Sequence, residues 1–238
     1  MNWQPFLTTL QHRPYVAAFL IAFMIIGFLN RGLTRTLLFL VIGYPVAFLS
    51  EFCSIRWGFP YGMYHYLYEN MPGELILGGV PVWDSVSYVF MAYASYEMAV
   101  FIGPIGRIRL IGPIFMVLLD IVTDPLAVRG DRWFLGRVFY YPNGGIYFGV
   151  PLSNFAGWFL VGLVIFSLYA LIERVGTRST RPGGWTPPLR FPTLGPIFYL
   201  SIMLFNLVIT FWIREWALGI IGAGILLLIA LVILEERR

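Results

Sequence analysis

The stretch VLLDIVTDPLAVRGDRWFLGRVFYYPNGGIYFGVPLSN, residues 117–154, decides the fold of this chain. It starts in an apolar run that ends at Asp124, and Arg129 follows five residues later. An aromatic segment then leads to Gly-Val-Pro at 149–151 and to Asn154, where another apolar run opens. Charged groups are costly inside a bilayer. The pattern therefore predicts a helix, a long polar loop and a second helix, with a functional site where they meet.

The same pattern occurs earlier in the chain. Glu51 ends an apolar run, Arg56 follows at the same spacing, and Gly-Val-Pro at 79–81 precedes Asp84. The copies are two apolar runs apart, so both cross the membrane in the same direction and both long loops lie on one face. We interpret them as two parallel helix-loop-helix repeats facing one cavity, with chance similarity over so few positions as the alternative.

Composition establishes the class of protein. Of 238 residues, 59% are hydrophobic and 12% are charged, whereas soluble domains carry about 25% charged residues. A hydrocarbon core of about 30 Å requires about 20 apolar residues per helix. The sequence predicts an all-α polytopic membrane bundle with seven spans, at about 15–30, 34–52, 80–102, 109–127, 151–172, 194–213 and 216–234.

The chain divides at a Gly/Pro/Arg-rich segment, residues 176–192. We expect a membrane core over 1–175, which contains the duplicated units at about 44–100 and 117–172. Residues 193–238 are expected to form a C-terminal helical pair that supports the packing.

The sixteen basic residues are all Arg and are dispersed, so the net charge of +4 does not indicate nucleic-acid binding. Seven spans place ten arginines on the side of the C-terminus and six on the other, which predicts a cytoplasmic C-terminus in a bacterial or archaeal cytoplasmic membrane. The first span is expected to remain as an anchor, since no cleavage site follows it. The single cysteine, Cys53, excludes an internal disulfide.

The loops at about 53–79 and 128–150 are rich in Trp, Tyr and Phe. Rings at this density either form an interfacial belt or line an apolar pocket. Because charged residues are interleaved with them, we favour a partly re-entrant lid over the helix ends. Pro81 and Pro151 fit the first turn of the helices that follow.

Asp120 and Asp124 are four residues apart and therefore lie on one helix face. Two carboxylates so close in a dry site should not both ionise, so we expect one neutral carboxylic acid that can donate a proton. The alternative is a structural pair neutralised by Arg129 and Arg132. His65 could shuttle a proton or only bond a neighbouring carboxylate.

Several established motifs are absent from the sequence. It contains no G-x-S-x-G element, Walker loop or dinucleotide fingerprint in the required context. One cysteine and two distant histidines do not form a His/Cys metal site, although Asp120 and Asp124 could bind Mg²⁺ through oxygen.

Three segments resemble the integral-membrane carotenoid 1',2'-hydratases, which act on γ-carotene, lycopene or bisanhydrobacterioruberin. They are SEFCSIRWGFPYGMYHY (50–66), GVPVWDSVSYVFMAYASY (79–96) and DIVTDPLAVRGDRWFLGRVFYYPNGGIYFGVPLSNFAGWFLVG (120–162). The resemblance covers about residues 44–166. It implies that water adds across the terminal C1'=C2' double bond of an acyclic ψ end, giving a tertiary alcohol, and it leaves the exact carotenoid open.

This chemistry suits the residues present. A strong general acid must protonate C2', water must capture the tertiary cation at C1', and aromatic faces can stabilise that cation, with no cofactor. The expected catalytic residues are Asp84, Asp120, Asp124, Glu51 and His65. The expected substrate and network residues are Arg56, Tyr64, Arg129, Asp131, Arg132, Trp133, Tyr140, Tyr141 and Asn154. Within this set, Glu51 and the arginines would hold the network and Asn154 would orient water.

Two other functions fit parts of the pattern. A membrane prenyltransferase would hold Mg-diphosphate on Asp120 and Asp124 with Arg129, Arg132 and Arg137, but such enzymes usually carry two Asp-rich motifs. A proton-coupled transporter would use the parallel repeats and paired acids around a polar cavity. The expected partners of the hydratase are membrane lipids and a carotenoid that enters from them, and the oligomeric state stays undetermined.

Overall fold

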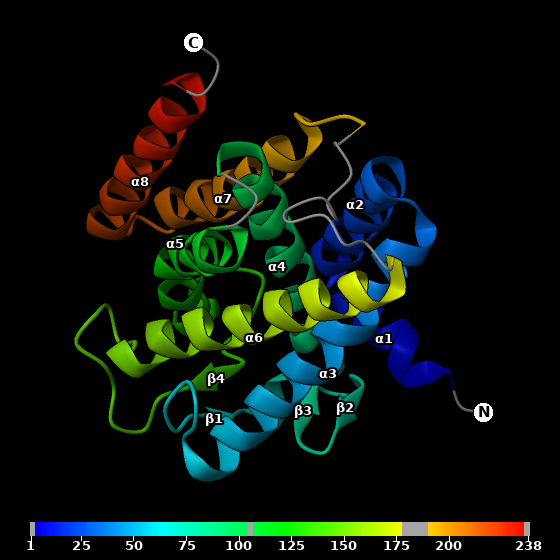
Figure 1. Ribbon diagram of the computed structural model, residues 1–238. Helices are drawn as coiled ribbons and strands as arrows, with labels where there is room; N and C mark the ends of the chain where they lie inside the picture. The colour runs from blue at the N-terminus through cyan, green and yellow to red at the C-terminus, as the bar shows by residue number, and fades with distance from the viewer. Residues whose placement is uncertain (1–2, 104–106, 178–189, 236–238) are drawn as a thin grey trace.

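The computed structural model describes residues 3–103, 107–177 and 190–235 of the chain. These residues form an all-α bundle, which confirms the predicted fold class (Figure 1). Its helices are α1 (Gln4–His12), α2 (Pro14–Arg31), α3 (Leu33–Trp57), α4 (Val82–Ile102), α5 (Ile108–Val128), α6 (Leu152–Thr177), α7 (Leu194–Trp212) and α8 (Trp216–Glu235). Helices α2 to α8 are long and apolar enough to cross a membrane, and each coincides with one predicted span.

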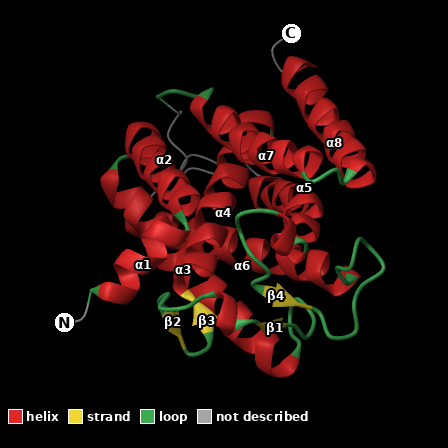
Figure 2. Ribbon diagram, turned by 180° about the vertical axis from the view of Figure 1, so that it is seen from behind, coloured by secondary structure: helices red, strands yellow, loops and turns green. Residues whose placement is uncertain are grey.

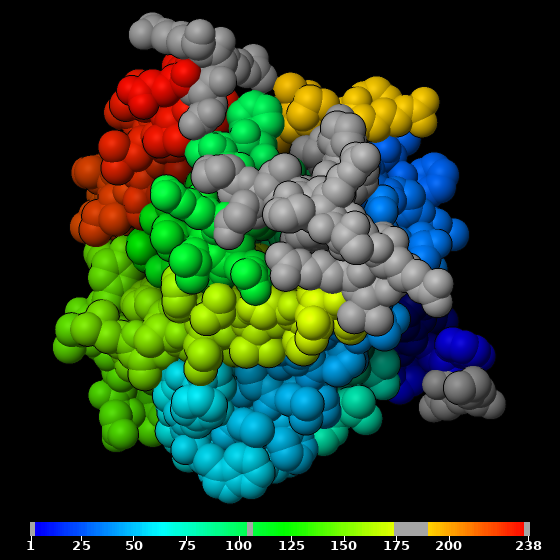
Figure 3. Space-filling model, viewed as in Figure 1, coloured from blue at the N-terminus to red at the C-terminus, as the bar shows by residue number. Residues whose placement is uncertain are grey.

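Helix α4 is the centre of the bundle. It packs against α2, α3, α5 and α7 and is buried on nearly every side. Small residues such as Ala92, Ala94 and Ala99 allow this, because they let neighbouring helices approach closely. Helix α6 lies against both α3 and α5 and crosses the face shown in Figure 3 between them.

Four short strands organise the loops at one end of the bundle (Figure 2). Strands β1 (His65–Tyr66) and β4 (Phe139–Tyr140) are antiparallel, with His65 opposite Tyr140, and they join the two long loops. Strands β2 (Ile76–Leu77) and β3 (Val80–Pro81) form a hairpin that leads into α4. Two 3₁₀ turns, η1 (Tyr68–Asn70) and η3 (Gly130–Arg132), complete the loops. The loops therefore form one connected cover, which we call the lid.

Three local expectations need correction. Helix α3 continues to Trp57, five residues beyond the expected boundary near 52, because nothing interrupts it before Gly58, whose φ of 72° ends the helix. Helices α4 and α6 begin one residue after Pro81 and Pro151, so these prolines precede the first turn. Helix α1 was not expected, since its nine residues are too short to span a membrane.

The C-terminal helices are packed on the core. Helix α7 contacts α2, α4 and α5, and α8 contacts α5 and α7. Most of the predicted linker at 176–192 lies outside the described residues. The side chain of Arg174 is also outside them, as are four whole residues: Arg178, Arg181, Arg237 and Arg238.

Candidate active site

The expected acids come together beneath the lid. Glu51 lies near the end of α3, Asp84 in the first turn of α4, and Asp120 and Asp124 in the last turns of α5. A cavity of about 60 Å³ is lined by Glu51, Asp84, Asp124 and Asn154. Since one water needs roughly 10–15 Å³ of such space, the cavity has room for several. We call it the polar cavity.

Glu51 and Asp84 meet at one tyrosine hydroxyl. Tyr66 Oη lies 2.6 Å from Asp84 Oδ2 and 3.3 Å from Glu51 Oε2. The Ser85 hydroxyl donates to the same Glu51 oxygen at 3.1 Å, and Tyr64 Oη lies 3.4 Å from Tyr66 Oη. A tyrosine hydroxyl carries a single proton, so Tyr66 can donate to only one of the two carboxyl groups at a time.

Asp120 and Asp124 form the second pair. Asn154 donates to Asp120 Oδ2 at 2.7 Å, and Tyr141 donates to Asp124 Oδ2 at 3.3 Å. Asp120 is fully buried, and its Oδ1 receives no N–H or hydroxyl donor from the described residues. Asp120 and Asp124 lie one turn apart on the same face of α5. Two carboxyl groups can share a hydrogen bond only when one of them carries a proton.

The lid tyrosines remain neutral donors. Burial raises the pKa of Tyr64 and of Tyr66 well above the usual range, and the nearby acids act in the same direction. Burial likewise raises the pKa of Tyr141, with Asp124 as the next cause. These hydroxyl groups therefore keep their protons at neutral pH.

An apolar cavity of about 100 Å³ adjoins the polar one. Asp84, Met91, Asp124, Phe139 and Trp158 line both cavities, so they mark the junction. Further aromatic residues line the rest of it, namely Tyr15, Phe19, Trp83, Phe90, Trp133 and Phe205. The two acids thus stand between a space for water and a space for an apolar group.

Arg56 and Arg129 lie outside these cavities and make matching contacts. Each donates to the backbone carbonyl four residues before it: Arg56 to Phe52 O at 3.2 Å and Arg129 to Pro125 O at 2.9 Å. Each also donates to the carbonyl of the residue that precedes Gly-Val-Pro. Arg56 donates to Gly78 O at 3.0 Å, and Arg129 donates to Phe148 O at 2.7 Å. The spacing of the two copies therefore reflects how the loops are fixed to their helices, and these arginines do not hold the carboxylates.

The remaining charged candidates are also distant from the acids. Arg132 is exposed and binds Glu215, which also pairs with Arg129 Nε at 3.1 Å. Asp131 is exposed on η3. His65 is exposed on β1, and its ring packs against Tyr140 at 5.8 Å between centroids. Successive strand residues point to opposite sides, so Tyr66 faces the site and His65 faces away.

Trp133 contributes to the apolar cavity, and its Nε1 donates to Leu126 O at 3.1 Å. The sequence interpretation omitted Tyr66 and Ser85. The alternation Tyr64-His65-Tyr66 was the available signal for Tyr66, because period two places both tyrosines on one face of a strand.

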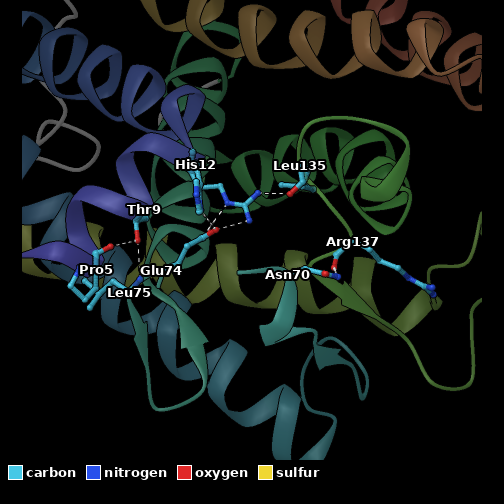
Figure 4. A network of polar contacts seen from close by, with 9 residues as sticks. Pro5, Thr9, His12, Asn70, Glu74, Leu75, Leu135 and Arg137 are labelled. Carbon is cyan, nitrogen blue, oxygen red and sulfur yellow. Dashed lines mark hydrogen bonds and ion pairs between the residues drawn. The ribbon is translucent and has the colours of Figure 1, made fainter. Parts of the chain in front are cut away.

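The sequence interpretation also missed a buried ion pair that closes the lid. Arg13, between α1 and α2, donates to both carboxylate oxygens of Glu74 at 3.2 and 2.9 Å and to Leu135 O at 2.5 Å. Figure 4 labels its two partners, Glu74 and Leu135, together with His12. His12 Nδ1 lies 3.3 Å from Glu74 Oε1. Since Glu74 belongs to the first loop and Leu135 to the second, Arg13 links both halves of the lid to the N-terminal helices.

The described residues contain no group of three or more His, Cys, Asp or Glu side chains placed to hold a metal ion. The carboxylates of the site are instead held by hydroxyl and amide donors.

Comparisons with known proteins found one matching family and one similar protein of known name. A family model described as "Carotenoid biosynthesis protein" matches residues 13–231. A bisanhydrobacterioruberin hydratase of Haloarcula japonica is 29% identical over 182 residues, which cover 74% of this chain and 58% of that protein. The chain therefore spans little more than half of the length of this relative. No solved structure matches the chain at a significant level.

Proposed function

The chain belongs to the carotenoid biosynthesis protein family, and on that premise we propose that it is a membrane hydratase. It adds water across the terminal C1'=C2' double bond of an acyclic carotenoid end group. The observation that carries the proposal is the position of Asp84 and Asp124, which line both the polar and the apolar cavity. The relative from Haloarcula japonica, a hydratase by name, supports the same class of reaction.

The reaction begins with proton transfer from the Asp120/Asp124 pair. Two buried carboxylates one helical turn apart repel each other, so we infer that the pair keeps one proton. Asp124 is the member that lines the cavities. Asp124 gives the proton to C2' of the alkene, the π bond breaks, and a tertiary cation forms at C1'. General acid catalysis of this kind contributes about 10²–10⁴ in rate.

Water then captures the cation. A water molecule in the polar cavity forms the new C1'–O bond and loses a proton to Asp84, which is held by Tyr66. The product is a tertiary alcohol. Return of the proton from Asp84 to the Asp120/Asp124 pair restores the site, so the cycle consumes only water and alkene.

Aromatic rings stabilise the cation. Trp158 and Phe139 line both cavities next to the two acids. The negative face of a ring attracts a cation, by about 0.5–2 kcal/mol when water is excluded. This lining suits an apolar substrate better than a diphosphate or a polar solute. Arg129 and Arg132, which a prenyltransferase would need beside the acids, are paired with Glu215.

The test is expression in a lycopene-producing host followed by mass analysis of the pigments. We expect the product to gain one water per ψ end, and Asp124→Asn and Asp84→Asn to abolish this gain. Glu69→Gln, an amide change at an exposed acid of the lid, is the matched control and should retain activity. Unchanged pigment with the wild-type protein, or full activity in both Asp variants, would refute the proposal.

A further inference from the structure

The apolar cavity is too small for a whole carotenoid. Its volume is about 100 Å³, whereas a cavity of about 150 Å³ holds one benzene molecule. Only the end of a long polyene fits beside Asp84 and Asp124. The remainder of the chain must leave the protein through a wall of this cavity, and the neighbouring cavities indicate which wall.

An apolar groove of about 650 Å³ lies on the outer side of α7. Leu204, Val208 and Trp212 line it and are more than half exposed, as expected for side chains that face lipid. Phe19 of α2 and Phe205 of α7 line both this groove and the apolar cavity. The groove and the cavity therefore meet between α2 and α7.

Aromatic side chains occupy this meeting point. The Phe205 ring lies 5.5 Å from that of Phe19, 5.6 Å from that of Tyr15 and 6.4 Å from that of Phe134, measured between centroids. Phe134 belongs to the second loop of the lid, and it also contacts Tyr15 at 5.7 Å. Four rings from three segments thus separate the cavity from the lipid, and a change of side-chain rotamer is a fast motion compared with helix movement.

We propose that these four rings form the substrate gate, and that the polyene passes between α2 and α7 with its unreacted length lying in the groove along α7. This inference rests on the proposed function and adds the route and the binding surface of the substrate. The groove suits such a chain because its lining is aliphatic and aromatic apart from Ser201.

A reversible block of the groove tests the gate on folded protein. In a Cys53→Ala background, Ser201→Cys places a thiol in the groove, and Ile197→Cys places one on the same helix outside it. Ile197 is 58% exposed, so the control thiol is accessible. Both purified proteins are treated in detergent or vesicles with benzyl methanethiosulfonate, the extent of modification is measured by mass, and hydration of lycopene is assayed before and after reduction.

We expect the modified Ser201→Cys protein to lose at least about tenfold in turnover, since a misplaced reacting end costs orders of magnitude. Reduction should restore activity, and fully modified Ile197→Cys should remain active. Full activity of completely modified Ser201→Cys, or equal inhibition of both proteins, would overturn the gate. Lack of hydration by the wild-type protein, assayed alongside, would instead refute the proposed function, so the two failures are distinguishable.

Discussion

The Tyr66 hydroxyl lies 2.6 Å from Asp84 Oδ2. This contact joins the lid to the helix bundle at the point where the proposed base must be oriented. The pairing of β1 with β4 holds Tyr66 over the helix ends. The consequences can be tested one residue at a time.

Tyr66→Phe should lower turnover by about tenfold or more while leaving the fold intact, because the ring remains and only the hydroxyl is lost, with its contacts to Asp84, Glu51 and Tyr64. The measurement is steady-state hydration together with thermal unfolding. Tyr68→Phe, which removes an exposed hydroxyl that donates to Gly79 O, is the control. Equal effects of the two variants would mean that the Tyr66 hydroxyl has no special role.

Asp120→Asn should be nearly as damaging as Asp124→Asn, although Asp120 does not line the cavities. An amide at 120 can donate to Asp124 and leave it as a carboxylate without the catalytic proton. Each variant should lose about 10²–10⁴ in turnover, and the double variant should lose no more than the worse single one, because the pair acts as a unit. Additive losses in the measured rates would show that the two acids act independently.

Asn154→Leu should destabilise the protein by about 1–3 kcal/mol, since it leaves the buried Asp120 Oδ2 without its donor. Leucine has the same branched shape and the same number of side-chain heavy atoms as asparagine, so the change leaves no cavity. The readout is thermal unfolding in detergent. Asn143→Leu, on the exposed part of the second loop, should leave the midpoint unchanged; a midpoint for Asn154→Leu equal to wild type would contradict the assigned bond.

Arg13→Met should cost about 3–5 kcal/mol, because it leaves Glu74 charged and buried. Adding Glu74→Gln should recover part of this loss, since the unpaired charge is then removed. Both are measured by thermal unfolding, with Arg137→Met at an exposed site as the control. No recovery in the double variant would mean that Arg13 acts mainly through Leu135 or through its packing on Trp83.

Glu215 should make stability depend on pH at the acid end. Partial burial opposes ionisation, but the hydrogen bond from Arg132 and the charge of Arg129 outweigh it and lower the pKa of Glu215. A lowered pKa in the folded state stabilises the protein above the ordinary value of 4.5, and this stabilisation is lost as the pH falls below it. Glu215→Gln should make the thermal unfolding midpoint depend less on pH between about pH 5 and 3 than it does in the wild type. An equal pH dependence of the midpoint in both proteins would contradict the prediction.

Much of the fold could be predicted because each span is a local property of the chain. An apolar run of about 20 residues must form a helix in lipid, where no water can satisfy its backbone groups. The positions of the seven spans could therefore be predicted without knowing which helices pack against them. The errors at Trp57 and Val82 arose at helix ends, where the first or last hydrogen bond depends on a single residue such as Gly58.

The candidate site could be predicted less completely. Glu51, Asp84, Asp120 and Asp124 were identified from the cost of burying charge, which is visible in the sequence. Arg56, Arg129 and His65 were grouped with them by proximity along the chain, yet their side chains point elsewhere. The direction of a loop side chain depends on strand pairing between residues 73 positions apart, as between Tyr66 and Phe139, and no local pattern encodes it.

The sequence by itself determined a seven-span bundle with two acid-bearing units, because hydrophobicity and charge act locally along each helix. Only the tertiary structure decided which donors hold those acids, that Arg13 closes the lid through Glu74, and that the apolar cavity meets the lipid between α2 and α7. The physical reason is that hydrogen bonds and cavities depend on distances between segments far apart in the chain, and packing alone sets those distances.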